Sequence, residues 1–266
     1  MWRIRNLALV AVLDLFTQCA RPVGPSRTSA IAAAARAIGA KDRDPKFRNP
    51  DYLAIRLLGG RERALLEGVG RFRSALDLEF GPAVEELGAY RGIVVSVLLR
   101  TKHIDAVLAQ MLTQQVGQVV VLGAGLDSRA CRFANSSPNT VFFEVDQPAT
   151  QRAKIWRLQE IFGTTPRHVR YVSMDFTSDD LLAKLRRAGF SETLTTMFIW
   201  EGVSMYLTAS AAEATLTFVR RHSAPGSAIV FDYYSDTHPS VNNPLSLVAQ
   251  LGEPMLFGVP GDKAAD

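Results

Sequence analysis

The sequence is 266 residues long, with 47% hydrophobic and 21% charged residues and a formal net charge of +4. This length suffices for one large domain, or one domain with a small appendage, around a sizeable core. The basic residues are spread out and no basic stripe with interleaved aromatics occurs, so nucleic acid is not expected as a partner. The two cysteines and four histidines show no ligand spacing, so we expect no disulfide framework and no metal site.

The first 20 residues combine two arginines with an apolar stretch that ends near Cys19, the outline of a secretory or lipoprotein signal. Asp14 interrupts the apolar run, however, and Gln18 is a poor match for the small residue expected before the cysteine. The stretch is also too short to span a bilayer. We therefore expect an N-terminal extension of uncertain character over residues 1–24, no stable membrane insertion and a cytoplasmic protein, with export as the alternative.

Residues 25–115 are expected to form a helical cap region, because no strand pattern occurs before residue 118. An alanine-rich, helix-favouring run is stopped by Gly39 and a charged segment. Amphipathic segments then continue to the end of the region. The predicted helices cover residues 29–40, 51–59, 61–76 and 84–114.

Residues 116–266 alternate between short β-branched or aromatic runs and helical segments. The five predicted strands are QVVVLG (118–123), TVFFEVD (140–146), HVRYVSMD (168–175), TTMFIWEG (195–202) and SAIVFDYY (227–234). This alternation is typical of an α/β fold with a parallel, doubly wound sheet. In such a sheet the ligand lies at the carboxyl ends of the strands.

A glycine-paired turn follows the first predicted strand, within VVVLGAGLDSR. The dinucleotide fingerprint requires a third small residue after Gly123 and Gly125, and here Ser128 takes that place. Asp146 lies 21 residues beyond Gly125, where an acidic residue is expected to hold a ribose; Glu144 is two residues earlier on the same strand face. These features indicate an adenosine ribose without distinguishing a dinucleotide from S-adenosylmethionine.

The ends of the later strands carry further candidates. Asp175 and Phe176 follow the third predicted strand, where a carboxylate can accept from an adenine amine and an aromatic ring can cover the base. Helix capping by Asp175 is the alternative. Glu201 ends the fourth predicted strand, and a carboxylate there is poorly explained as core and suits a cationic ligand group.

Together these segments resemble the S-adenosylmethionine-dependent methyltransferases of the leucine carboxyl methyltransferase family, in particular its bacterial branch abundant in actinobacteria. The resemblance covers about residues 25–258. The segments that carry it, in order, are RTKHID (100–105), VVVLGAGLDSR (119–129), FFEVDQP (142–148), SMDF (173–176) and WEGVSMYL (200–207).

The resemblance implies a class I Rossmann-like methyltransferase fold with helical additions at the N-terminus, and S-adenosyl-L-methionine as cofactor. It implies that Arg100 binds the methionine carboxylate and that Glu201 faces the methionine amino group. It also implies that Gly123 and Gly125 admit the methionine part. Residues 116–266 would then form the cofactor-binding core, with Asp146 at the ribose and Asp175 and Phe176 at the adenine.

We expect O-methylation of an unidentified carboxylate or hydroxyl acceptor, with Tyr206 as a candidate for orienting it. A tyrosine that simply packs on the sheet is the alternative. An α/β-hydrolase would need G-x-S-x-G, and GLDSR and GVSMY both lack the second glycine. An NAD(P)-dependent oxidoreductase leaves Glu201 unexplained, and a weak or inactive methyltransferase-like binding protein remains a further alternative.

The resemblance also implies two antiparallel edge strands beyond the GEPMLFG segment (252–258), and the printed sequence leaves no room for them. We therefore expect a sheet with an exposed edge, which is a liability for aggregation and for pairing with other chains. A shortened protein with oligomerisation through this edge is the corresponding expectation.

Overall fold

The computed structural model describes residues 25–42, 44–45, 48–64, 66–67, 89–136, 138–176, 178–238, 246–250 and 252–260. The N-terminal extension and part of the helix predicted over 61–76 lie outside the described residues. None of the described helices is long and apolar enough to cross a bilayer.

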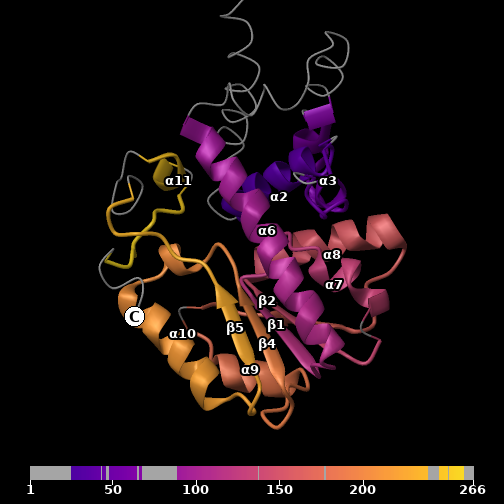
Figure 1. Ribbon diagram of the computed structural model, residues 1–266, viewed down its shortest axis with the longest axis vertical. Helices are drawn as coiled ribbons and strands as arrows, with labels where there is room; N and C mark the ends of the chain where they lie inside the picture. Colours follow the sequence, from indigo (N-terminus) through magenta and orange to yellow (C-terminus); the bar gives the residue numbers. More distant parts are fainter. Residues whose placement is uncertain are drawn as a thin grey trace, which may run out of the picture.

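Five parallel strands form a single sheet in the order β3-β2-β1-β4-β5 (Figure 1). Each strand lies within a predicted β-branched or aromatic run. Their bounds are β1 Gln118–Leu122, β2 Val141–Asp146, β3 Val169–Ser173, β4 Thr196–Trp200 and β5 Ala228–Phe231. The chain winds from β1 to one side and continues from β4 to the other, so the strand order reverses between β1 and β4. In open α/β sheets, ligands bind beyond the carboxyl ends of the strands at such a reversal.

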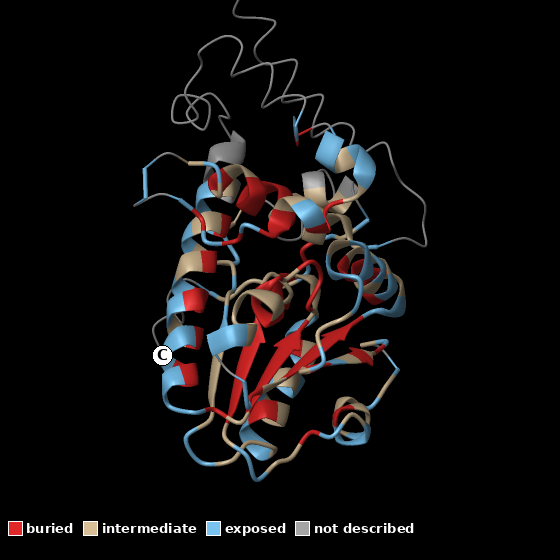
Figure 2. Ribbon diagram, turned by 90° about the vertical axis from the view of Figure 1, so that its right-hand side faces the viewer, coloured by how far each residue is buried: buried red, intermediate tan, exposed pale blue. Residues whose placement is uncertain are grey.

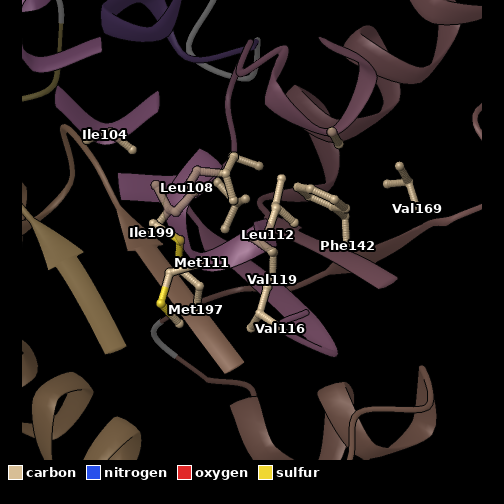
Figure 3. Close-up of a cluster of buried hydrophobic side chains, with 13 residues drawn as sticks. Ile104, Leu108, Met111, Leu112, Val116, Val119, Phe142, Val169, Met197 and Ile199 are labelled. Carbon is tan, nitrogen blue, oxygen red and sulfur yellow. The ribbon is translucent and has the colours of Figure 1, made fainter. Parts of the chain in front are cut away.

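Alternate residues of the central strands face two different apolar layers, which is why these strands read as continuous hydrophobic runs. Val119 and Val121 of β1 face α6 (Ala89–Thr113), in a cluster with Leu108 of that helix (Figure 3). Val120 and Leu122 face the opposite layer, formed by α9 (Leu181–Arg187) and α10 (Ala209–Arg221). The strands are therefore buried on both faces (Figure 2).

A third apolar cluster joins the N-terminal helices to the sheet domain. It contains residues of α2 (Arg27–Gly39) and α3 (Ala54–Leu57), together with Leu158 of α8 (Pro148–Phe162). Ser26 caps α2 by accepting a hydrogen bond from the Ser29 amide, and the C-terminal segment adds the Glu253 carboxylate, which accepts from the Arg27 amide at 2.9 Å. Segments near both ends of the described chain therefore meet at the start of α2.

The helices that follow the strands begin and end at residues that are typical of helix termini. Pro148 begins α8, and Gly163 ends it in a left-handed conformation at φ 73°. Asp180 caps α9 by accepting from the Ala183 amide at 3.1 Å. The capping alternative for Asp175 is therefore wrong, because the helix begins later than the local sequence suggested.

Two predicted helices are shorter than expected. The segment 51–59 forms only the four-residue α3, since Leu58 is extended and Gly59 and Gly60 follow. The helix after the glycine turn is α7 (Arg129–Arg132), and the 3₁₀ turn Ala134–Ser136 continues it.

β5 forms one edge of the sheet, and Phe231 and Tyr233 are exposed there. In the described part of the chain after β5 the structure has the short helix α11 (Leu247–Gln250) and one isolated bridge between Ser235 and Val259, but no further strand. Pairing of this edge with another chain stays a prediction.

Candidate functional site

The glycine turn lies at the carboxyl end of β1, next to the point where the strand order reverses. Gly123 and Gly125 both have left-handed backbones, at φ 70° and φ 44°. A Cβ atom at Gly123 would lie 2.4 Å from Val203 Cγ2, and one at Gly125 would lie 2.9 Å from Ser29 Cβ. A residue other than glycine is therefore disfavoured at both positions, by backbone conformation and by the neighbouring side chains.

Asp146, at the end of β2, binds this turn directly. One carboxylate oxygen accepts a short hydrogen bond from the Gly125 amide, and the other accepts from the Gln147 amide at 2.6 Å. Burial raises the pKa of Asp146, and the two amides oppose that rise. Each carboxylate oxygen has a second lone pair, so the predicted ribose contact is compatible with these bonds.

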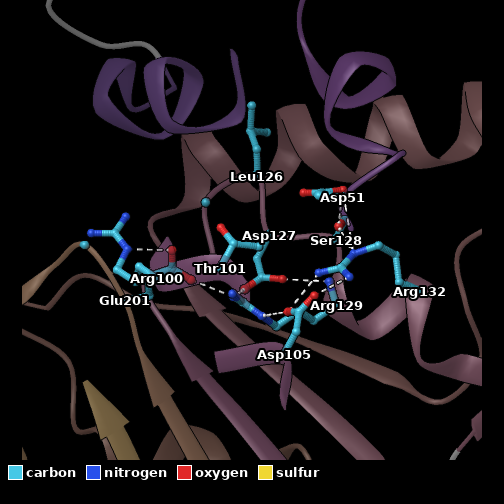
Figure 4. Close-up of polar contacts among 12 residues, drawn as sticks. Asp51, Arg100, Thr101, Asp105, Leu126, Asp127, Ser128, Arg129, Arg132 and Glu201 are labelled. Carbon is cyan, nitrogen blue, oxygen red and sulfur yellow. Dashed lines mark hydrogen bonds and ion pairs between the residues drawn. The ribbon is translucent and has the colours of Figure 1, made fainter. Parts of the chain in front are cut away.

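Arg100 and Glu201, predicted to bind opposite charges of one ligand, form an ion pair with each other. Arg100 on α6 approaches the end of β4, and its Nε donates to Glu201 Oε1 at 2.8 Å (Figure 4). Arg100 Nη1 also forms a short ion pair with Asp232, which follows β5. The two side chains are 16% and 9% exposed, so the pair is largely shielded from water.

A second arginine, Arg129, contacts the same glutamate from the other side. Its Nη1 donates to Glu201 Oε2 at 2.6 Å and to Asp127 Oδ2 at 2.5 Å, and its Nε donates to Asp105 Oδ1 at 2.7 Å (Figure 4). Arg129 and these two aspartates were not among the predicted site residues. Asp105 lies in the segment RTKHID, and Asp127 and Arg129 lie in GLDSR. The only feature of the sequence that could have identified them is that they are charged and stand next to apolar runs.

The charged residues continue away from Glu201 as an alternating series. Arg132 Nη1 contacts Asp105 at 2.5 Å, Arg132 Nε lies 3.7 Å from Asp51, and Asp51 pairs with Arg36 at 2.8 Å. We call the whole set the charge cluster. It consists of Arg36, Arg100, Arg129, Arg132, Asp51, Asp105, Asp127, Glu201 and Asp232.

The arginines of the charge cluster favour the ionised forms of two buried carboxylates, Asp127 and Glu201. Burial by itself raises the pKa of Asp127, but Arg129 and then Lys154 outweigh it and hold that pKa far below its usual range. Burial likewise opposes the charge of Glu201, and Arg129 and Arg100 keep its pKa below normal. Asp127 and Glu201 are therefore negative at neutral pH.

The adenine candidates lie beside Asp146 rather than in the charge cluster. The Met174 amide donates to the Asp146 carbonyl at 2.9 Å, which fixes the end of β3 next to β2. Asp175 is exposed, and its amide donates to Asp179 Oδ2 at 2.8 Å. Phe176 is half-buried and packs on the apolar cluster below the sheet.

Tyr206 lies in the 3₁₀ turn Ser204–Tyr206, beyond β4, and is half-buried. Burial raises its pKa above the ordinary value, against a hydrogen bond from Thr28, so the phenol is neutral at physiological pH. Glu253, Tyr234 and Arg100 are its charged and polar neighbours. The structure therefore brings Tyr206 close to Arg100 and to the start of α2.

Glu144, by contrast, does not join the candidate site. Its carboxylate is buried against Lys154 Nζ of α8 at 2.7 Å, and burial raises its pKa. Among the described residues no group of three or more side chains has the composition of a metal site.

The sequence from residue 29 to residue 220 matches the family model described as leucine carboxyl methyltransferase. A Bacillus subtilis relative named "Putative S-adenosyl-L-methionine-dependent methyltransferase YktD" is 31% identical over 245 residues, which are 86% of this chain and 80% of the relative. A Mycobacteroides abscessus relative, "Putative S-adenosyl-L-methionine-dependent methyltransferase", is 35% identical over 172 residues, which are 64% of this chain but only 57% of the relative.

A solved structure from Thermobifida fusca, described as a "putative methyltransferase", has a TM-score of 0.53 and 14% identity to this chain. The match covers 90% of this chain and 77% of the solved one. At this level of identity the likeness concerns the fold, and it agrees with the parallel sheet and added N-terminal helices.

Proposed function

The chain belongs to the leucine carboxyl methyltransferase family of S-adenosyl-L-methionine-dependent methyltransferases, and we propose that it methylates an oxygen atom of a carboxylate or hydroxyl acceptor. The observation that carries the proposal is the pairing of Arg100 with Glu201 beside the glycine turn, at the carboxyl ends of the strands. The methionine part of the cofactor is a zwitterion, which needs a cation for its carboxylate and an anion for its ammonium group.

The charge cluster also fits the cofactor in its overall charge. It contains four arginines and five carboxylates, so it carries one surplus negative charge when all are ionised. S-adenosylmethionine carries a sulfonium, an ammonium and a carboxylate, a net charge of one positive. The cofactor would therefore neutralise the surplus charge of the cluster.

In this proposal Arg100 and Glu201 exchange part of their mutual contact for the two charged ends of the methionine group. Gly123 and Gly125 would let the backbone of the turn approach the methionine chain, because both adopt left-handed conformations that favour glycine. Asp146 accepts from the ribose hydroxyls with its remaining lone pairs. Asp175 and Phe176, at the neighbouring strand end, would contact the adenine.

The bound cofactor supplies a methyl group on a positively charged sulfur. The methyl group would pass to the acceptor oxygen and the sulfur–methyl bond pair would stay on sulfur, with S-adenosylhomocysteine as the second product; the proton of a hydroxyl acceptor would pass to water. A carboxylate acceptor is already ionised at neutral pH and needs no base. Tyr206, as a neutral phenol, can donate a hydrogen bond that orients the acceptor, and alignment is the main requirement for such a displacement.

The proposal is tested with S-adenosylmethionine labelled in its methyl group, offered with a panel of aliphatic and aromatic carboxylic acids and phenols. Methyl esters release volatile methanol in alkali and aryl methyl ethers do not, so the product separates the two acceptor classes. We expect an alkali-labile or alkali-stable product with the wild-type chain, and at least a tenfold loss with Glu201→Gln.

Two results would contradict the proposal. One is wild-type protein that folds cooperatively and binds neither S-adenosylmethionine nor S-adenosylhomocysteine in calorimetry. The other is methylation confined to nitrogen or sulfur nucleophiles added to the same panel.

A further inference from the structure

Arg129 lies at the centre of the charge cluster without a role in the proposed reaction. We propose that it is a positioning residue: it holds Asp127 and Glu201 together so that the Glu201 carboxylate is presented to the ammonium group of the methionine part. This inference rests on the proposed function, and it names the residue that prepares the anionic half of the site.

The geometry places one guanidinium between three separate elements. Arg129 begins α7, directly after the glycine turn, and its side chain is 3% exposed. Its Nη1 contacts both Glu201, at the end of β4, and Asp127, in the turn; its Nε contacts Asp105 on α6 (Figure 4). Two carboxylates thus converge on a single nitrogen atom.

The remaining nitrogen of the Arg129 guanidinium takes no part in these ion pairs. Arg129 Nη2 is buried and has no hydrogen-bond partner within the described part of the chain. A buried donor without a partner is unfavourable for folding, since its bonds to water are lost and not replaced. An ordered water, a ligand or a rearrangement on ligand binding would supply the missing contact.

Removing this guanidinium would leave like charges facing each other. Glu201 is surrounded by Arg100 from α6, Arg129 from α7, Arg36 from α2 and Asp127 from the turn. Without Arg129, the repulsion between Asp127 and Glu201 would favour protonation of one of them or rotation of Glu201 away from the site. Either change removes the anion that the ammonium group requires.

Arg132 provides a matched control on the same helix. It lies three residues further along α7, its side chain is 6% exposed, and it shares Asp105 with Arg129. Its other contacts are Ser128 Oγ at 2.8 Å and Asp51, and Glu201 is not among them. Arg132→Gln therefore also removes one positive charge from the charge cluster, as Arg129→Gln does, but it leaves the contacts to Glu201 in place.

The experiment compares two ligands across Arg129→Gln, Arg129→Lys and Arg132→Gln of the full chain, by titration calorimetry. S-adenosylhomocysteine carries the amino-acid group, whereas 5′-methylthioadenosine has the same nucleoside without it. For Arg129→Gln we expect the affinity for S-adenosylhomocysteine to fall by about 30-fold or more at pH 6.5, because truncating one member of a buried charge pair has effects of this size. The affinity for 5′-methylthioadenosine should change less than threefold.

The expected pattern has two further parts. Arg129→Lys should recover part of the lost affinity, because it restores a positive charge beside Asp127 and Glu201. Arg132→Gln should alter the affinities for the two ligands by the same factor. Thermal melting of each variant identifies the folded fraction, and Arg129→Lys remains as the test if Arg129→Gln does not fold.

The inference is overturned if Arg129→Gln, or Arg129→Lys in its place, weakens both ligands equally or weakens neither. In that case wild-type binding still stands and the proposed function is untouched. Wild-type protein that binds neither ligand overturns the proposed function itself, and this outcome is distinguishable because it appears before any variant is compared.

Discussion

The sheet domain contains two groups of buried charges, and they are built differently. Glu144 of β2 and Lys154 of α8 form a closed pair at 2.7 Å, in which each charge has the other as its partner. The charge cluster around Arg129 is open: it joins at least four elements of the fold and has surplus negative charge when all its members are ionised.

The difference indicates that one group of buried charges serves folding and the other serves ligand binding. A closed pair has its Coulomb attraction to offset the cost of removing two ions from water, and its loss is felt mainly in stability. An open cluster with surplus charge is stabilised further by a ligand of opposite charge. Altering the closed pair should therefore change folding, and altering the open cluster should change binding.

The largest expected effect comes from breaking the closed pair. Lys154→Met leaves Glu144 buried without a counter-charge, and we expect the free energy of unfolding to fall by about 3–5 kcal/mol in urea denaturation. Lys184→Met, which breaks the half-exposed pair with Asp179, is the control and should cost less than about 1 kcal/mol. Equal losses in the two variants would contradict the distinction between the buried and the exposed pair.

Removing Arg100 should act on binding instead. Arg100→Ala takes away the cation for the methionine carboxylate, while Glu201 keeps Arg129 as a partner. We expect about 30-fold weaker binding of S-adenosylhomocysteine in calorimetry, equivalent to about 2 kcal/mol, with 5′-methylthioadenosine little affected. A large fall in the melting temperature with unchanged affinity would show that Arg100 belongs with the structural charges.

The pH dependence of stability sharpens the comparison further. The pKa of Asp127 lies below its ordinary value of 3.8, so its ionised form stabilises the folded state above about pH 4, and this contribution disappears as the pH falls. Wild-type protein should therefore lose stability between about pH 5 and pH 3. Asp127→Asn should show a weaker dependence by about 1–2 kcal/mol over this range, measured by urea denaturation at each pH. Parallel curves for the two proteins would contradict the assignment.

The smallest expected effect concerns the surplus charge. Asp232→Asn removes one negative charge from the cluster and keeps an oxygen that can accept from the Gly202 amide. Because S-adenosylmethionine carries one more positive charge than S-adenosylhomocysteine, the variant should shift the ratio of their affinities by about threefold against the former. An unchanged ratio in competition calorimetry would show that the surplus charge has no part in cofactor preference.

The sheet could be predicted from the sequence because its strands are buried on both faces. Runs such as Val119–Leu122 contain no polar interruption and end at turns, and this pattern has few other solutions. The lengths of α3 and α7 could not be predicted. The helix α3 ends because Leu58 has an extended backbone, and α7 ends where the chain continues as the 3₁₀ turn Ala134–Ser136.

The site was predictable where a charged residue ends a buried strand. Asp146 and Glu201 stand out for this reason, and Arg100 was selected only through its place in a family segment. Arg129 and Asp105 could not be paired from the sequence, since they lie 24 residues apart on different helices and either could equally face water. The pairing of Arg100 with Glu201 was also not foreseen, because each had been assigned to a ligand rather than to the other.

A crystal structure of the full chain with S-adenosylhomocysteine tests the central claim most directly. The claim predicts the amino-acid group of the ligand between Arg100 and Glu201, the ribose on Asp146 and the adenine beside Asp175 and Phe176. A ligand bound elsewhere, with the contacts between Arg100 and Glu201 unchanged, would contradict it.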